Sequence, residues 1–175
     1  FPRQNCDCQA TANVILSNST VLFDGVAEVG TEQLIADICP NCNPGGSIFS
    51  YTFVDTVSPT PTPTPTDEVP GDFSFVFTPT QISSPACAAI NGGGLQATVT
   101  GTGVRTFTAT STQDTLSFEL ILRELPGVTD EFRLILRNAL GAIVFDTGFK
   151  AVPDANLVVQ DCVTFPDVIP TPAVP

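Results

Sequence analysis

Hydrophobic and polar residues alternate along most of this chain with a period of two, the pattern of strands that bury one face and expose the other. Glycine and proline separate almost every alternating stretch from the next. Two further apolar runs, residues 14–16 and 21–23, flank a polar Ser-Asn-Ser-Thr segment. The alternating apolar positions are Phe49, Tyr51 and Phe53; Phe73, Phe75 and Phe77; Leu95, Ala97 and Val99; Leu116, Phe118, Leu120 and Leu122; and Ile143, Phe145, Phe149, Leu157 and Val159.

This pattern predicts about nine short strands joined by turns, which is typical of an all-β domain. We therefore expect an antiparallel β-sandwich, jelly-roll-like, with extended arms at both ends. The expected organisation is a connector arm over residues 1–12, a sandwich domain over residues 13–164 and a proline-rich tail over residues 165–175.

One segment, residues 129–141, fits a helix as well as a strand. Thr129 and Asp130 suit a helix start, and the apolar positions after them also recur with a helical period. The same residues alternate as Phe132, Leu134 and Leu136. We favour a strand, followed by a hairpin turn over residues 137–142, because the neighbouring segments are strands and consecutive strands usually pair.

A low-complexity segment of alternating proline and threonine occupies residues 58–70. Proline has no backbone N–H and holds its neighbour extended, so this segment cannot join a sheet. We expect a protruding polyproline II loop rather than a linker between domains. Thr60, Thr62, Thr64 and Thr66 are candidate sites for O-linked sugars, and Asn18 begins an Asn-Ser-Thr sequon for N-glycosylation.

The charge balance disfavours two classes of partner. The 175 residues carry a formal net charge of −12, which would repel nucleic acids and anionic membrane surfaces. No apolar run approaches the roughly 20 residues that a spanning helix needs. The sequence contains no methionine, so we expect that an upstream segment was removed, as export would do.

Six cysteines in a chain without histidine indicate an oxidising compartment and disulfides. Zinc binding is the rival interpretation, but the spacing of Cys6 and Cys8 is too tight for paired zinc ligands. The Cys-Pro-Asn-Cys motif at Cys39 and Cys42 resembles a redox motif, yet it runs into an Asn-Pro-Gly-Gly turn instead of a helix. We expect no metal and no cofactor.

The disulfide connectivity is open, because six cysteines allow fifteen pairings. Cys87 and Cys162 are isolated near strands and are the expected long-range pair. Cys6 and Cys8 are poorly placed to bond each other. Each therefore finds a partner elsewhere, either in Cys39 or Cys42 of the same chain or in another subunit.

No catalytic constellation is visible, and we expect no enzyme. Without histidine there is no imidazole for a nucleophilic triad. Glu119, Glu124 and Asp146 could serve a glycosidase, but a chain with no tryptophan and one tyrosine has little to stack on a sugar. Glu119 is more simply explained as a cross-strand partner of Arg133 or Arg137. The Gly-Gly-Gly sequence at residues 92–94 is interpreted as a turn.

What remains is assembly. An inert domain preceded by an arm with two cysteines resembles, in its architecture, the disulfide-linked appendage subunits of bacterial endospores and, more broadly, donor-strand pilins. The resemblance implies a structural subunit of an extracellular filament, pilus-like appendage or surface coat on a cell or spore, which joins identical subunits by strand exchange and disulfides. The alternative is a secreted module that binds carbohydrate, or another ligand with the help of calcium.

Overall fold

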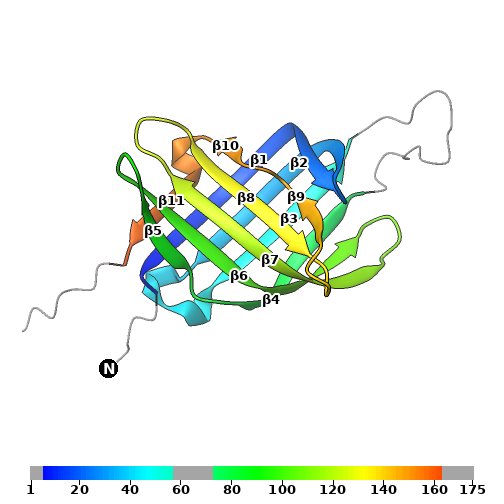
Figure 1. Cartoon of the computed structure of the whole chain (residues 1–175), viewed down its shortest axis with the longest axis horizontal. Helices are drawn as coiled ribbons and strands as arrows, with labels where there is room; N and C mark the ends of the chain where they lie inside the picture. The colour runs from blue at the N-terminus through cyan, green and yellow to red at the C-terminus, as the bar shows by residue number, and fades with distance from the viewer. Residues whose placement is uncertain (1–5, 57–72, 163–175) are drawn as a thin grey trace, which may run out of the picture.

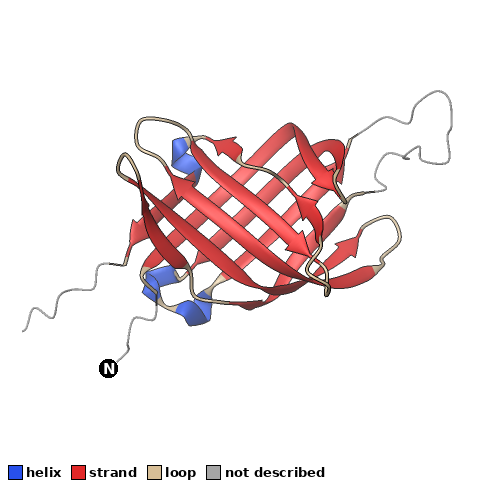
Figure 2. Cartoon of the chain, in the orientation of Figure 1, coloured by secondary structure: helices blue, strands red, loops and turns tan. Residues whose placement is uncertain are grey.

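The computed structural model describes residues 6–56 and 73–162. Most of this part of the chain is in strands, and it contains no α-helix, which confirms the all-β prediction (Figure 2). Three short 3-10 turns lie between strands: η1 (Pro40–Cys42), η2 (Pro44–Gly46) and η3 (Asp154–Asn156). The strands are β1 (Cys8–Phe23), β2 (Val26–Ile38), β3 (Ile48–Asp55), β4 (Phe75–Ile82), β5 (Ala86–Ile90), β6 (Gly94–Phe107), β7 (Gln113–Glu124), β8 (Asp130–Arg137), β9 (Ile143–Asp146), β10 (Lys150–Val152) and β11 (Leu157–Asp161).

All strand pairs are antiparallel, and the sheet closes on itself. Strands β1, β2, β3, β4, β6, β7 and β8 follow one another in the sheet, and β9 pairs with both β8 and β1. This ring of eight strands is a barrel, so the predicted jelly-roll sandwich is replaced by a simpler meander. In the view of Figure 1, β6, β7 and β8 cross in front of β1, β2 and β3.

Three short strands extend the ring. Strand β5 continues β4 along β6, while β10 continues β9 along β8, and β11 lies along the first part of β1. Between β9 and β11, β1 therefore lacks a strand partner on that side among the described residues. The Lys150 ammonium on β10 donates to the Thr20 carbonyl on β1 and bridges this seam.

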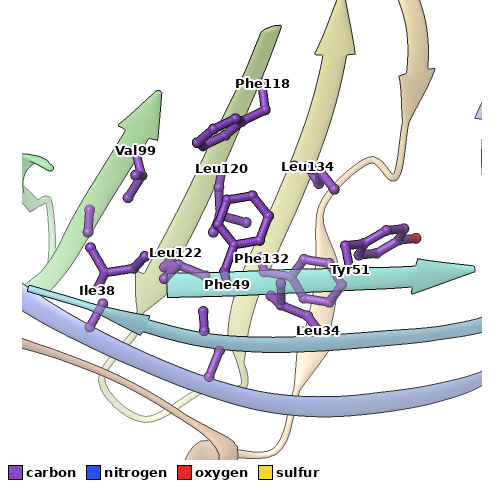
Figure 3. Packing of buried hydrophobic residues seen from close by; sticks show 14 of the residues in the cluster. Leu34, Ile38, Phe49, Tyr51, Val99, Phe118, Leu120, Leu122, Phe132 and Leu134 are labelled. Carbon is purple, nitrogen blue, oxygen red and sulfur yellow. The ribbon is translucent and has the colours of Figure 1, made fainter. Parts of the chain in front are cut away.

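Inward-facing side chains fill the barrel. Phe49 and Tyr51 of β3 and Leu34 of β2 meet Leu120 and Leu134 of the opposite layer (Figure 3). Close backbone approach makes room for the aromatic rings: a Cβ atom at Gly103 would lie 2.5 Å from the Phe77 ring, so only glycine fits there. The interior is thus a packed hydrophobic core of the kind expected for a small barrel.

Local structure confirms two predictions and corrects two. Residues 130–137 form β8, and the turn after it is held by the Asn138 N–H donating to the Ala142 carbonyl. Residues 14–16 and 21–23, predicted as separate runs, belong to one strand with a bulge between Leu16 and Ser19. Asn18 takes a φ of 51° there, a conformation that asparagine tolerates well. The barrel also begins earlier than the expected residue 13, because Cys8 already pairs with β11.

Candidate functional site

The two ends of the barrel are built differently, and one of them holds every cysteine. Disulfides join Cys6 to Cys39, Cys8 to Cys87 and Cys42 to Cys162, with Cα–Cα distances of 6.4, 6.0 and 5.6 Å. We call this the cystine end. It brings together the start of β1 with the two residues before it, the β2–β3 connection, β5 and Cys162 directly after β11.

These pairings correct the expected connectivity. Cys87 and Cys162 do not bond each other, and the intrachain alternative for the arm, a bond from Cys6 to Cys39, is confirmed. No free cysteine remains to link subunits. Cys39 and Cys42 belong to separate disulfides, so the motif that contains them is neither a redox pair nor a zinc knuckle.

A tight turn places Cys39 and Cys42 side by side. The Cys42 N–H donates to the Cys39 carbonyl at 2.7 Å, and the Cys39 N–H donates to Ser47 Oγ at 2.8 Å. Cys39, Asn41 and Cys42 all have φ between 51° and 60°, a region that non-glycine residues occupy only when their surroundings hold them there. The two disulfides and Pro40 supply that constraint.

The opposite end, which we call the aromatic end, is closed by phenylalanine packing. The Phe145 ring lies 4.9 Å from the Phe23 and Phe75 rings and is fully buried. Arg105 lies 4.6 Å from the Phe107 ring centroid and binds Asp114 with two hydrogen bonds, of 3.0 and 2.7 Å. Arg105 thus combines a charge pair with stacking on apolar surface.

A polar cluster lies inside the barrel wall beneath the seam. The Tyr51 hydroxyl donates to Glu32 Oε1 at 2.6 Å, and the Ser19 hydroxyl donates to Glu32 Oε2. Burial raises the pKa of Glu32 above its ordinary value, although these two hydrogen bonds and the nearby charge of Lys150 oppose the shift. Burial and the adjacent carboxylate raise the pKa of Tyr51 well above its ordinary range. The cluster therefore holds a carboxyl group that takes up a proton more readily than an exposed glutamate does.

Sequence reasoning missed this cluster, although one signal was present. Glu32 lies on the same inward face of β2 as Leu34 and Ala36. The alternation along this strand therefore placed a carboxyl group in the core. Its partners come from the bulge in β1 and from β3. Nothing local in the sequence shows that these three strands bring their polar side chains together.

The outer surface of β7, β8 and β9 carries paired charges. Arg137 binds Glu119 at 3.5 Å, which confirms the predicted cross-strand pair. Arg133 binds Asp146 with hydrogen bonds of 3.0 and 2.6 Å. Burial opposes ionisation of Asp146, but the hydrogen bonds from Arg133 and from the Gly148 N–H outweigh it and lower its pKa. A guanidinium of this group, that of Arg123, lies 4.0 Å from the Phe149 ring centroid.

The outer surface of β1 to β4 is different, because it carries no ionisable side chain across three neighbouring rungs of the sheet. Ile15 exposes 63% and Ile35 46% of its surface. Asp37, two residues beyond Ile35, marks the edge. We call this surface the uncharged face; it consists of Ile15, Gln33, Thr52 and Val76 in one rung, Asn13, Ile35 and Ser50 in the second, and Thr31 and Val54 in the third.

The three carboxylates considered for a glycosidase have separate partners: Glu119 binds Arg137, Asp146 binds Arg133 and Glu124 accepts from a backbone N–H. Glu124 and Asp130 lie in a groove of about 440 Å³ between the 92–95 turn and the 124–127 hairpin. They accept backbone hydrogen bonds from Val159 and Leu125 respectively. Across residues 6–56 and 73–162, no group of three or more His, Cys, Asp or Glu residues is placed to hold a metal ion.

The glycosylation candidates divide between the described and undescribed parts of the chain. Asn18 is exposed at the β1 bulge, where its side chain is accessible from solvent. Thr60, Thr62, Thr64 and Thr66 lie outside the described residues, as does the predicted loop over residues 58–70. The tail over residues 165–175 also lies outside them.

Comparison of the chain with protein-family models, with curated proteins and with solved structures finds no match. No helix in the described part of the chain is long and apolar enough to cross a membrane. The function must therefore be argued from the geometry above.

Proposed function

We propose that this protein is a structural subunit of an extracellular filament, pilus-like appendage or surface coat, and that it assembles with copies of itself through the uncharged face. The observation that carries the proposal is the sorting of charge on the barrel surface. The chain has a net charge of −12, yet the three rungs of the uncharged face, on four adjacent strands, carry no ionisable group. Isoleucine and valine side chains are exposed there.

Charge sorting favours a second copy as the occupant of this face. Two copies repel each other over most of their surfaces, so they approach with least electrostatic cost where both are neutral. The four strands span roughly 15 Å at a spacing of about 4.8 Å. The outward residues of β6, from Thr98 to Thr106, are also uncharged and widen the surface. A stable interface buries roughly 800 Å² on each partner, which is more than three rungs of four strands supply, so the contact extends beyond them onto the outer surface of β6.

The filled barrel and the internal disulfides support a structural role. The core side chains leave the interior occupied, in contrast to barrels that carry a ligand inside. Three disulfides suit an oxidising, extracellular setting and a subunit that must persist there. Strand exchange has a suitable edge at β5, whose only strand partner in the described part of the chain is β6. Disulfides between subunits are no longer part of the proposal, because all six cysteines are paired within the chain.

Charge insertion tests the face. In the double variant Ile35→Lys and Val54→Lys, both new ammonium groups stand on the uncharged face; in the control Val128→Lys and Leu140→Lys, they stand on exposed turn residues. Both variants reduce the net charge equally, so general repulsion falls in each. Sedimentation velocity over a concentration series and negative-stain microscopy report assembly.

We expect the wild-type chain and the control to form dimers or larger assemblies, and the face variant to remain monomeric. The control matters because a loss of assembly in the face variant cannot then be attributed to added lysine or to net charge. A wild-type chain that stays monomeric at every concentration, or a face variant that assembles like the wild type, contradicts the proposal.

A further inference from the structure

Two of the three disulfides meet at one short turn, and this gives the chain a second covalent route between its ends. Cys6 is bonded to Cys39, and Cys162 is bonded to Cys42. The covalent route from Cys6 to Cys162 therefore needs only the backbone from Cys39 to Cys42 and two disulfides. The ordinary backbone route passes through every strand of the barrel.

The rest of the described chain lies in two closed loops off this route. The Cys6–Cys39 bond has a sequence separation of 33 and closes a loop that contains β1 and β2. The Cys42–Cys162 bond has a sequence separation of 120 and closes a loop that contains β3 to β11. All eight strands that form the barrel therefore lie in one loop or the other.

We propose that this arrangement is a covalent bypass, which carries tension between the two chain ends and keeps it off the barrel. Force that enters before Cys6 and leaves after Cys162 passes through the disulfides and the Cys39–Cys42 turn. No strand pair has to separate to transmit it. The turn is already compact, with the Cys42 N–H bonded to the Cys39 carbonyl, so it has little length to give.

The third disulfide is off this route. Cys8 and Cys87 join β1 to β5 inside the two loops, so their bond does not shorten the path from Cys6 to Cys162 while the other two are intact. The bypass goes beyond the proposed function, because the force that it carries enters and leaves through the chain ends and not through the uncharged face. Its test uses single molecules, so it succeeds or fails independently of assembly through the uncharged face.

Single-molecule force spectroscopy on the full chain, with handles at its two ends, measures the bypass directly. We expect the oxidised wild-type chain to show no unfolding step up to the force at which the handles or covalent bonds break. Adding a reductant to the mounted molecule should then produce unfolding that releases roughly 50 nm in total, since about 150 residues of roughly 3.5 Å each enter the path. This experiment uses the unsubstituted protein, so its result does not depend on whether a cysteine variant folds.

Three double variants locate the path. Cys8→Ser with Cys87→Ser, which leaves the bypass intact, should show no step, like the wild type. Cys6→Ser with Cys39→Ser should release roughly 12 nm. Cys42→Ser with Cys162→Ser should release roughly 25 nm, because the remaining Cys8–Cys87 bond still shortens the path. A long step in the oxidised wild-type chain, or a step in the Cys8 and Cys87 variant, overturns the bypass.

Discussion

The cystine end and the aromatic end of this barrel close the same eight-stranded sheet by different means. At the cystine end, three disulfides tie strands and connections together, including the buried Cys8 and Cys39. At the aromatic end, the rings of Phe23, Phe53, Phe75 and Phe145 pack at centroid distances of 4.9–6.3 Å. One end is held by covalent bonds that redox conditions can break, and the other by hydrophobic burial that they cannot.

The difference follows from where the chain enters and leaves. Cys6, two residues before β1, and Cys162, directly after β11, both lie at the cystine end, where disulfides fasten them to the β2–β3 connection. Terminal segments are mobile unless something holds them. At the aromatic end, the described connections include the 24–25 turn between β1 and β2 and residues 108–112 between β6 and β7, and aromatic side chains pack beneath them. The comparison predicts that the two ends respond to different perturbations.

Removing the disulfide that closes the longest loop should have the largest effect on stability. For a loop separation of 120, the chain-entropy account predicts a loss of about 5 kcal/mol when Cys42 and Cys162 are both replaced by serine. The same substitutions at Cys6 and Cys39, with a separation of 33, should cost about 4 kcal/mol. Guanidinium unfolding under oxidising conditions measures both.

The order of these two values is the informative result. Reduced wild-type protein should be less stable than either variant, because it lacks all three bonds. If the Cys6 and Cys39 variant loses more than the Cys42 and Cys162 variant, constraint of the unfolded chain is not the main source of stability at this end.

Truncating an aromatic ring at the other end should cost nearly as much. Phe145 is fully buried and contacts four other rings, so Phe145→Ala should destabilise the fold by about 3–5 kcal/mol. Phe149→Ala is the matched control, because Phe149 is 37% exposed on the outer surface, and a loss of less than about 1.5 kcal/mol is expected there. Thermal unfolding of both variants, oxidised and reduced, checks the values.

This loss should be the same before and after reduction if the two ends act separately. A Phe145→Ala effect that disappears in the reduced protein would show that the aromatic end forms only when the cystine end is closed.

The smallest expected effect is a pH dependence from the polar cluster. Because the folded pKa of Glu32 lies above its ordinary value of 4.5, the neutral carboxyl stabilises the fold at low pH, and this contribution is lost as pH rises through the folded pKa. Glutamine is neutral at every pH. The stability of Glu32→Gln relative to the wild type, as measured by denaturant unfolding, should therefore rise as pH increases above the ordinary value of 4.5.

Asp146 supplies a control of opposite sign. Its folded pKa lies below its ordinary value of 3.8, so its contribution is present above that pH and is lost as pH falls through the folded value. Asp146→Asn should lose stability at pH 7 and lose less at low pH. A Glu32→Gln variant whose difference from the wild type does not change with pH would show that Glu32 ionises freely in the fold.

Much of the fold could be predicted from alternation, which reports a local property. The inward positions of β3, β4 and β7 were all visible in the sequence, and so was the pairing of Glu119 with Arg137. Barrel closure was not visible, because it depends on two residue pairs, Leu22 with Asp146 and Phe23 with Phe145, far apart in the sequence. Alternation is the same in a sandwich and in a barrel.

The disulfide pattern could not be predicted for a similar reason. Cys87 bonds Cys8 because β5 and the start of β1 meet at the same end of a closed sheet, a fact that follows from topology and not from spacing. The uncharged face can be recognised only when the register of the four strands is known, because the register sets which residues share a rung. Sequence alone showed only isolated threonines and isoleucines.

The most direct test of this account is the disulfide map of the native protein. Asp-N protease cleaves before Asp7 and so separates Cys6 from Cys8, while Cys39 and Cys42 stay together on residues 37–54. We predict two linked species by mass spectrometry without reduction: one of three peptides with Cys6, Cys39, Cys42 and Cys162, and one of two peptides with Cys8 and Cys87. A species that links Cys87 to Cys162 would contradict the covalent bypass. So would a disulfide that joins two copies of the same peptide, because it would link two chains.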